Sequence, residues 1–500
     1  MKWDKLKESD KNTYSQRLSE IVFHEPSPLT KLNCEETCIC RDAKCHATIQ
    51  NEYNHLIQCL KKADHCLPRY RPGTEKDWWN DNLTQLRDKS KEIHAIWVSE
   101  GRPRHGATHS KRLIARAAYK RAIRIAQKAP KQRTWDRLHS ELADKDTHSF
   151  WQSWRRLYNK NKSHLAPVVG GCSSEKDIAE CFKEKFLKSS QPNNKENVHQ
   201  LNASFVDKHT EYVKKHDESC DCKHVYISLF NTIDAIGCMK GGKCADSDGI
   251  SAEHFVNAPL NVLIRLTNLL NAMLKHAFVP KQFLLGDMTP ILKDHLGNHA
   301  DTVNYRGITI SPQASKILEH VLKDIFCNDL LTSPYQFGFR KRSSTTHALH
   351  CLKQTVNFYV NHGSRVYCSF LDASKAFDRL VHAGLFIKLM ERNIPLVFLE
   401  IIITWYGDLM CRVKWGDHYS DWFQIKAGVR QGGVLSPDFY GIYIDGLIEK
   451  LKSSKIGYYA NIFAAALLYA DDMALLSPSI RGLQRMLNIC AQYCEEWDVC

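Results

Sequence analysis

Hydrophobic positions follow a helical spacing in the first third of the chain. Between residues 110 and 132, apolar side chains recur every three or four positions beside a dense row of cationic ones. This spacing predicts a helix, which Pro130 is expected to interrupt. A second helix is expected to carry the aromatic residues Phe150, Trp151, Trp154 and Tyr158. Residues 1–165 are therefore expected to form a mainly α-helical region.

Between about residues 187 and 223 the chain turns polar, with runs such as SSQPNNKENVHQLN and KKHDESCDCKH. A stretch so poor in apolar side chains predicts a long connection without a packed core of its own. We therefore expect residues 166–224 to form a polar, partly flexible connection.

From residue 225 onward, short strand patterns alternate with helical ones. The expected strands are residues 365–371, 411–415, 421–426, 462–468 and 473–476, and the second and third of these form a hairpin that turns near Gly416 and Asp417. The expected helices are residues 382–392, 396–409, 437–451 and 481–497, with Ser436 as the N-cap of the third. This alternation predicts an α+β fold.

The composition is that of a folded protein and excludes a collagenous or largely disordered chain, because 43% of the 500 residues are hydrophobic and 25% are charged. The formal net charge is +14, and residues 101–140 alone hold twelve basic residues and one acid. A surplus of one sign favours a polyanionic partner such as RNA or DNA. A solvated helix face is the alternative interpretation of the same residues.

The chain carries no sequence signal for a membrane or for secretion. No apolar run reaches the roughly 20 residues that span a bilayer, and residues 1–12 lack the apolar core of a secretory signal. The 19 cysteines are then expected to be reduced thiols. We expect an intracellular protein, in the nucleus, the cytoplasm or both.

Two groups of cysteine and histidine residues invite a zinc interpretation. The first spans residues 34–46 and comprises Cys34, Cys38, Cys40, Cys45 and His46. Its spacing fits no common structural zinc pattern, so small buried residues in a helical region are the favoured interpretation. The second group, which comprises Cys220, Cys222 and His224, is a weaker candidate.

Asp471 and Asp472 stand side by side within the apolar segment LLYADDMALL. Charges among apolar residues are costly unless they are paired or bind a cation. An exposed turn that happens to end in two acids is one interpretation. The other is a hairpin turn that presents two carboxylates to Mg²⁺, which prefers oxygen ligands.

Asp372 ends a predicted strand of its own, in the segment SFLDASKAFDRL. Three aspartates from two neighbouring strands can hold two Mg²⁺ ions, one activating a primer 3′-hydroxyl and the other binding a triphosphate. Asp378 is expected instead to lie at the N-terminus of a helix. The glycine-rich segment GVRQGGVLSP at residues 428–437 would let the backbone approach a flat ligand closely.

The segments LDASKAFD, GVRQGGVLSP and LLYADD, in this order, resemble the reverse transcriptase domain of non-LTR (LINE-type) retrotransposons. Four upstream segments agree: KCADSDGI, TPILK, NYRGI and QFGFR. Residues 76–90 and 148–157 resemble the segment that links the endonuclease of such elements to the polymerase.

The resemblance implies a right-hand polymerase, with fingers over residues 225–345 and palm over residues 346–500, preceded by the basic helical linker region of residues 1–165. The implied activity is that of an RNA-directed DNA polymerase, a nucleotidyltransferase that adds dNTPs to a DNA primer on an RNA template. Two Mg²⁺ ions are the implied cofactor, with Mn²⁺ as a substitute. Their ligands and the catalytic residues would be Asp372, Asp471 and Asp472.

The resemblance also assigns roles to residues around these aspartates. Phe377 would be the aromatic gate that excludes a ribose 2′-hydroxyl, while Lys293 and Arg306 would hold the triphosphate. Gln431 and Gly432 would pack against the incoming nucleotide. The residues expected to contact primer or template are Tyr469, Arg116, Lys120 and Arg124.

Two alternatives remain open at this point. The chain departs from the family at Cys244-Ala-Asp-Ser-Asp-Gly-Ile and at Tyr305-Arg-Gly-Ile, and it ends before a thumb is expected. An inactive, truncated retroelement relic that only binds nucleic acid is therefore the first alternative. An RNA-copying or telomeric polymerase is the second, and Phe377 with the Tyr-Ala-Asp-Asp sequence argues against an RNA-synthesising enzyme.

Overall fold

The computed structural model describes residues 3, 6–32, 39–68, 79–144, 150–151, 154, 166–218, 225–340, 342–373, 376–459 and 463–499. The chain divides into two compact units, of which the smaller is formed by Arg69–Leu165. The larger contains Lys2–Pro68 together with Ala166–Cys500. The expected helical region of residues 1–165 is thus divided, because the helices before Pro68 bury their apolar faces in the larger unit.

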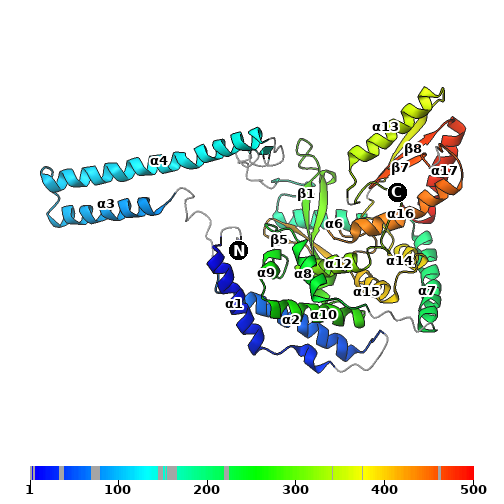
Figure 1. Cartoon of the computed structure of the whole chain (residues 1–500), viewed down its shortest axis with the longest axis horizontal. Helices are drawn as coiled ribbons and strands as arrows, with labels where there is room; N and C mark the ends of the chain where they lie inside the picture. The colour runs from blue at the N-terminus through cyan, green and yellow to red at the C-terminus, as the bar shows by residue number, and fades with distance from the viewer. Residues whose placement is uncertain are drawn as a thin grey trace. The chain divides into compact units, whose positions relative to one another are not determined.

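The smaller unit is a helical hairpin of α3 (Asp81–Ser99) and α4 (Ala107–Ala143) (Figure 1). The Asn80 side chain caps α3 by accepting a hydrogen bond from the Leu83 N–H at 2.9 Å. Helix α4 continues through Pro130, so the predicted interruption is wrong. Proline removes one helical hydrogen bond, and the turns on either side propagate the helix past that loss. Of the second aromatic helix, only Phe150, Trp151 and Trp154 lie within the described residues, and all three are helical.

In the larger unit, two N-terminal helices pack against each other and against a later one: α1 (Glu8–His24), α2 (Ala43–Asp64) and α10 (Leu260–Lys275) (Figure 1). Helix α2 begins where the Asp42 carboxylate accepts a hydrogen bond from the Lys44 N–H at 3.0 Å. Its apolar positions recur at helical spacing, with Ile49, Tyr53, Leu56 and Leu60 all buried. The 3₁₀ helix η2 (Pro28–Lys31) connects α1 to the segment before α2.

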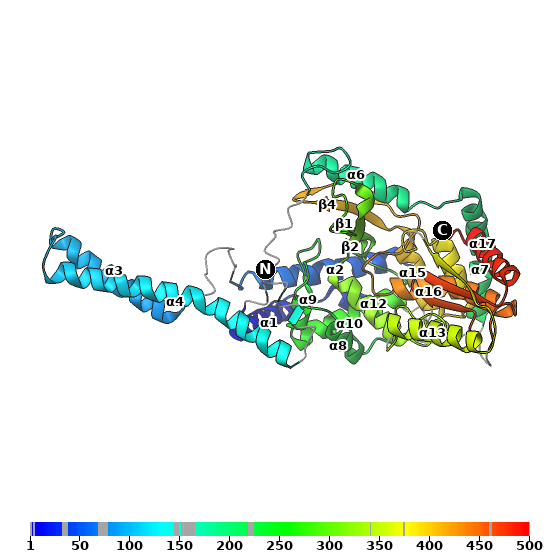
Figure 2. The same ribbon diagram turned by 90° about the horizontal axis from the view of Figure 1, so that it is seen from above.

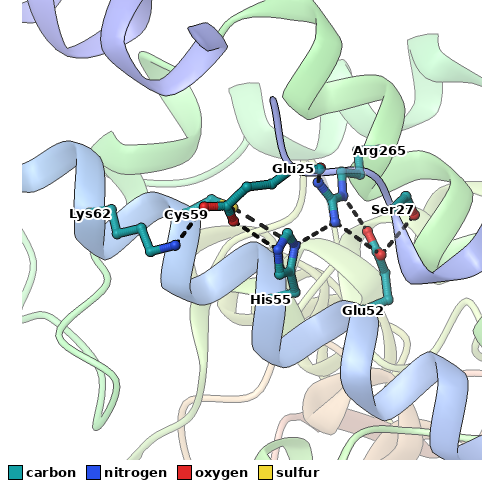
Figure 3. A network of polar contacts seen from close by, with 7 residues as sticks. All are labelled: Glu25, Ser27, Glu52, His55, Cys59, Lys62 and Arg265. Carbon is teal, nitrogen blue, oxygen red and sulfur yellow. Dashed lines mark hydrogen bonds and ion pairs between the residues drawn. The ribbon is translucent and has the colours of Figure 1, made fainter. Parts of the chain in front are cut away.

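A network of polar contacts joins α2 to α10 (Figure 3). The Arg265 Nε donates to Glu52 at 2.5 Å, and the two side chains are 6% and 0% exposed. Ser27 donates its hydroxyl to Glu52 at 2.7 Å, while Lys62 and His55 contact the Glu25 carboxylate at 2.6 and 2.8 Å. Both buried charges therefore have hydrogen-bonding partners, as buried charges require.

The first sheet has the strand order β2-β1-β4-β5, with β6 paired to β4. Its strands are β1 (Leu285–Leu292), β2 (Tyr305–Ile310), β4 (Met410–Trp415), β5 (His418–Tyr419) and β6 (Phe423–Gln424). Strands β1 and β4 are parallel, and the other pairs are antiparallel. The predicted hairpin is present, because Trp415 pairs with His418 across the turn at Gly416 and Asp417. Its second arm is divided between β5 and β6.

The second sheet has the order β3-β8-β7 and is antiparallel throughout. It consists of β3 (Tyr367–Asp372), β7 (Ala466–Tyr469) and β8 (Asp472–Ser477), close to the predicted strands. Helix α13 (Thr345–Asn361) contacts β7, and α17 (Ile480–Glu496) contacts β3 and β8 (Figure 1). Strand residues on the α17 side, such as Leu475, are fully buried, and the alternation of β-strand side chains makes this possible.

Further helices fill the space around the sheets. They are α8 (Leu229–Gly237), α9 (Ala252–Val256), α11 (Lys281–Leu284), η3 (Thr302–Asn304), α12 (Gln313–Ile325), α14 (His382–Glu391), α15 (Leu396–Gly407) and α16 (Ser436–Ser453). Helix α16 includes Ser436 as its first residue, so the N-cap is Leu435 and not Ser436 as predicted. The buried Glu319 carboxylate accepts hydrogen bonds from the N–H groups of Val434 and Leu435, which immediately precede the helix.

The polar stretch expected to be a connection is largely helical. Helices α6 (Glu175–Ser189) and α7 (Lys195–Glu218) occupy most of it. Helix α6 lies beside β4 (Figure 2) and also contacts β5, and α7 packs against α14. Tyr212 is buried and donates its hydroxyl to the Ile394 carbonyl at 2.6 Å. Helix α7 contacts the core through a narrow face, so its composition is polar although it is helical. Cys220, Cys222 and His224 lie outside the described residues, as do Cys34 and Cys38.

The mixture of helices and sheets agrees with the predicted α+β class. Among the described helices, none combines the length and the apolar character that a bilayer crossing requires.

Candidate active site

The three aspartates singled out in the sequence meet at one end of the second sheet. The β3–β8 register places Asp372 directly opposite Asp472, and Tyr469 pairs with Asp472 on the other side. Asp471 occupies the turn between β7 and β8, and its carbonyl accepts a hydrogen bond from the Ala373 N–H at 3.3 Å. A two-residue turn between paired strands thus brings Asp471 and Asp472 to the end of the strand that carries Asp372.

The electrostatics of this site disfavour three negative charges. Burial raises the pKa of the Asp471 carboxyl above its usual value, and the neighbouring carboxylates of Asp472 and Asp372 raise it further. The Arg306 guanidinium acts in the opposite direction and lowers this pKa. A cation bound among the carboxylates would relieve the same repulsion.

The donor set fits a hard divalent cation. Mg²⁺ and Mn²⁺ prefer carboxylate oxygens, and Asp372, Asp471 and Asp472 supply them from two strands and a turn. Among the described residues, the groups of three ligand atoms that lie within 4.8 Å of one another do not include these aspartates.

The turn that carries Asp471 is held by a glutamine from the QFGFR segment. Gln336 is 2% exposed, and its side-chain amide accepts from the Ala470 N–H at 2.9 Å and donates to the Ala470 carbonyl at 3.1 Å. Ala470 has φ +59°, a backbone conformation that costs energy for a residue with a Cβ. Gly338 lies so close that a Cβ there would stand 2.3 Å from the Ala470 nitrogen. The conformation of the turn therefore depends on Gln336 and Gly338.

Phe377 lies within an aromatic group beside the aspartates. Its ring is stacked on Tyr440 at 5.4 Å and meets the edge of Phe339 at 5.7 Å. Burial raises the pKa of the Tyr440 hydroxyl, and the charges of Asp471 and Asp372 raise it further, which places Tyr440 within electrostatic reach of both. The position of Phe377 is thus fixed from two sides next to the carboxylates.

The glycine-rich loop packs against the segment that follows Asp372. The N–H groups of Gly428 and Val429 donate to the carbonyls of Leu380 and Phe377, both at 2.7 Å. Gly428 has φ +99°, and a Cβ on it would stand 2.5 Å from the Asp378 carbonyl oxygen. Only glycine allows this approach of two backbones.

Gln431 and Gly432 connect that loop to β2. The Gln431 carbonyl accepts from the Thr309 N–H at 2.9 Å, and the Gln431 side-chain amide donates to Asp378 at 2.7 Å. Asp378 lies in a turn four residues before α14, so the expectation that it opens a helix is wrong. Its carboxylate accepts the hydrogen bond that orients the Gln431 side chain.

Among the remaining predicted residues, Tyr469 lies opposite Asp472 in the sheet, and the others lie on other elements. Arg306 is exposed on β2 and reaches Asp471 electrostatically, whereas Lys293 is exposed just beyond the end of β1. Tyr469 and Asp472 line a cavity of about 280 Å³ between α13 and the second sheet. Arg116, Lys120 and Arg124 lie on α4 in the smaller unit.

Four residues with clear structural roles were absent from the predicted site: Gln336, Phe339, Asp378 as a partner of Gln431, and Tyr440. The QFGFR segment offered a signal for the first two, because it was part of the family resemblance. Tyr440 lies on α16 in an ordinary helical pattern, and its place beside Phe377 depends on packing between elements.

Known proteins resemble this chain in the region that contains the three aspartates. Residues 291–500 match the family described as "Reverse transcriptase (RNA-dependent DNA polymerase)". A probable RNA-directed DNA polymerase from transposon BS of Drosophila melanogaster is 29% identical over 285 residues, which cover 54% of this chain and 30% of that relative. The RNA-directed DNA polymerase from the mobile element jockey of the same species is 28% identical, over 48% of this chain and 27% of that relative.

A third relative is the Pol polyprotein of the retrotransposable element R2DM of Drosophila melanogaster, which is 24% identical over 48% of this chain and 22% of its own length. Among solved structures, an apo telomerase from Candida tropicalis aligns with 86% of this chain and 91% of its own, at 13% identity and a TM-score of 0.33. The chain spans less than a third of the length of these three curated relatives. The resemblance to non-LTR reverse transcriptases that the motifs predicted is confirmed, and all three aspartates lie in the matched region.

Proposed function

We propose that this chain is the reverse transcriptase part of a non-LTR retrotransposon protein and extends a DNA primer on an RNA template. The observation that carries the proposal is the register that sets Asp372 against Asp472, with Asp471 in the adjoining turn. The match of residues 291–500 to the reverse transcriptase family supports it. Three acidic side chains at one sheet end are what metal-assisted nucleotidyl transfer requires.

In this proposal Asp372, Asp471 and Asp472 hold two Mg²⁺ ions, which activate the primer 3′-hydroxyl and stabilise the leaving pyrophosphate. Arg306, already within electrostatic reach of Asp471, binds the triphosphate together with Lys293. Gln431 and Gly432 form the surface against the incoming base, and Tyr469 lies near the primer end. Phe377, fixed between Phe339 and Tyr440, excludes a ribose 2′-hydroxyl.

The proposal extends to the division of the chain. Residues 225–345 would form the fingers and residues 346–500 the palm of a right-hand polymerase. The cationic residues Arg116, Lys120 and Arg124 of α4 would contact primer or template phosphates. These charges also favour the second candidate function, an inactive protein that binds nucleic acid through the smaller unit.

The test is primer extension with purified protein, an RNA template, a DNA primer, dNTPs and Mg²⁺. We compare the wild type with Asp471→Asn and with Asp417→Asn, which removes the same charge at an exposed turn remote in sequence from the aspartates. Extension by the wild type and Asp417→Asn but not by Asp471→Asn is the expected result. RNA binding without extension by the wild type, in Mg²⁺ and in Mn²⁺, would favour the binding protein instead.

A further inference from the structure

Three soft ligand groups converge at a buried point of the larger unit, remote in sequence from the aspartates. The Sγ atoms of Cys40 and Cys45 and a ring nitrogen of His276 all lie within 4.8 Å of one another. The three residues are 1%, 7% and 0% exposed. Cys40 precedes α2, Cys45 lies in its first turn, and His276 is the C-cap residue of α10.

Contacts of neighbouring groups hold the three residues in place. The Cys40 N–H donates to the Lys275 carbonyl at 3.3 Å, which ties the segment before α2 to the end of α10. The His46 Nε2 donates to the His276 carbonyl at 3.3 Å, and the His46 ring stacks on Phe278 at 4.6 Å. His46, part of the sequence-based zinc interpretation, thus supports His276 through its backbone and is not one of the converging groups.

We infer that Cys40, Cys45 and His276 bind a zinc ion. Two thiolates and an imidazole are a donor set typical of Zn²⁺ in proteins, where ligands at about 2.3 Å (sulfur) and 2.0 Å (nitrogen) form a tetrahedron. In such a tetrahedron the sulfur atoms stand about 3.8 Å apart, so the observed convergence needs only a small contraction. The described residues supply three of the four positions.

A second group of potential ligands, Glu25, His55 and Cys59, is a poorer candidate (Figure 3). Lys62 contacts Glu25 at 2.6 Å, and Arg265 contacts the Nδ1 of His55 at 2.6 Å. Two cations already neutralise this group, and an added metal ion would have to displace or repel them. The group also contains one thiol instead of two, which makes it a weaker zinc site than the pair of Cys40 and Cys45 with His276.

The zinc ion would join two parts of the chain that are more than 200 residues apart in sequence. It would fix the start of α2 to the end of α10, beside the network of Figure 3 that fixes the middle of α2 to the same helix. The zinc ion would therefore hold the N-terminal helices against the rest of the larger unit, and this role would not depend on polymerase activity.

The first measurement is the zinc content of wild-type protein purified without chelators, together with the absorption spectrum after exchange to Co²⁺. We expect about one tightly held zinc ion per chain and strong thiolate-to-cobalt charge-transfer bands. Carboxylate-bound Co²⁺ at the three aspartates would not give these bands. Neither measurement depends on whether a variant folds.

Variants then assign the ligands. Cys40→Ser and His276→Gln are expected to lose the bound zinc, while Cys59→Ser, which removes a different buried thiol on α2, is expected to keep it. Circular dichroism and gel filtration of each variant establish that it is folded. The inference is overturned if wild-type protein holds no zinc and gives no thiolate bands, if Cys59→Ser alone loses the metal, or if Cys40 and Cys45 form a disulfide in the native protein.

Discussion

The side-chain amide of Gln336 forms hydrogen bonds to both backbone groups of Ala470, the residue immediately before the Asp471–Asp472 pair. The same oxygen also accepts from the Gly338 N–H at 2.9 Å. Gln336 also forms an isolated parallel β-bridge with Leu468, near the end of β7. A buried side chain thereby determines the direction in which the turn presents two carboxylates.

The first prediction concerns this contact. Gln336→Leu removes three hydrogen bonds and leaves the buried Gly338 N–H and the part-buried backbone groups of Ala470 without them, at a cost of about 1–3 kcal/mol in the free energy of unfolding. Because the turn positions Asp471, we expect the rate of nucleotide addition at saturating dNTP to fall by roughly tenfold or more, with a smaller change in primer binding. Single-turnover kinetics measure both quantities.

The control is Gln484→Leu, on the exposed side of α17, which is expected to leave both quantities unchanged. A Gln336→Leu enzyme with a wild-type rate of nucleotide addition would show that the turn keeps its conformation without the amide.

The second prediction concerns the raised pKa of Asp471. Its folded-state pKa lies above the unfolded value, so ionisation disfavours the folded state once the pH exceeds the folded pKa. Without divalent cations at neutral pH, Asp471→Asn is therefore expected to raise the melting temperature slightly, by about 1–2 °C. The difference should shrink as the pH falls below the folded pKa, and Mg²⁺ should stabilise the wild type more than the variant. Differential scanning calorimetry at several pH values tests this, and equal melting temperatures throughout would contradict it.

The third prediction concerns Asp246 in the KCADSDGI segment. Its carboxylate accepts hydrogen bonds from the N–H groups of Ile250 and Gln313 at 2.9 and 2.8 Å, and burial raises its pKa to about 6. Asp246→Ala is expected to lower the free energy of unfolding by about 1–3 kcal/mol, because these buried N–H groups lose their acceptor. Urea unfolding measures the difference, with Asp234→Ala on α8 as a control.

The pH dependence of this effect has a definite sign. The folded pKa of about 6 exceeds the ordinary value of 3.8, so the proton is bound more tightly in the folded state. The resulting stabilisation is fully present below the ordinary pKa and is lost as the pH rises towards about 6. Asp246→Asn cannot titrate, and its stability should not follow this fall.

The fourth prediction concerns Phe377. Phe377→Ala opens the space between Phe339 and Tyr440, and we expect incorporation of ribonucleotides relative to deoxynucleotides to rise by at least roughly tenfold. Competition between labelled rNTP and dNTP in primer extension gives the ratio. Phe230→Ala, at a phenylalanine that is exposed on α8, should retain the wild-type ratio. An unchanged ratio in Phe377→Ala would remove Phe377 from the nucleotide site.

The fifth prediction concerns the buried pair of Arg265 and Glu52 (Figure 3). Arg265→Met leaves the fully buried Glu52 carboxylate without its charged partner and is expected to cost about 3–5 kcal/mol in the free energy of unfolding. The double variant Glu52→Leu with Arg265→Met replaces the pair by apolar groups and should recover most of that loss. Chemical denaturation of the wild type, of the single variants Arg265→Met and Glu52→Leu, and of the double variant completes a double-mutant cycle, and strictly additive losses would argue against a coupled pair.

The strands and carboxylates of the second sheet could be predicted from sequence because local patterns define them. Apolar strands that end at Asp372 and flank Asp471 and Asp472 are visible in the chain itself. The contact of Gln336 with Ala470 could not be predicted, since it joins residues 134 positions apart through packing. The convergence of Cys40 and Cys45 with His276 has the same cause, because α10 brings the histidine from a distant part of the sequence.

For the polar stretch before residue 225, the sequence pattern led to a wrong prediction of local structure. Low apolar content suggested a connection, yet α7 forms because its few apolar residues, such as Tyr212, lie on one face against α14. In the N-terminal region the error was to assign residues 1–165 to one helical region, whereas the structure divides them between two units. The apolar face of α2 predicts a partner helix but does not say which one, and the partner α10 lies in the larger unit.

The packing of α2 against α10 also determines how early the newly synthesised chain can complete this part of its fold. About 200 residues separate the end of α2 from the start of α10. At about 5–20 residues per second, a ribosome needs roughly 10–40 s to make them. During that interval the buried face of α2, including Ile49, Tyr53 and Leu56, lacks its native partner. The nascent chain therefore has a period in which chaperones, or premature aggregation, compete for that face.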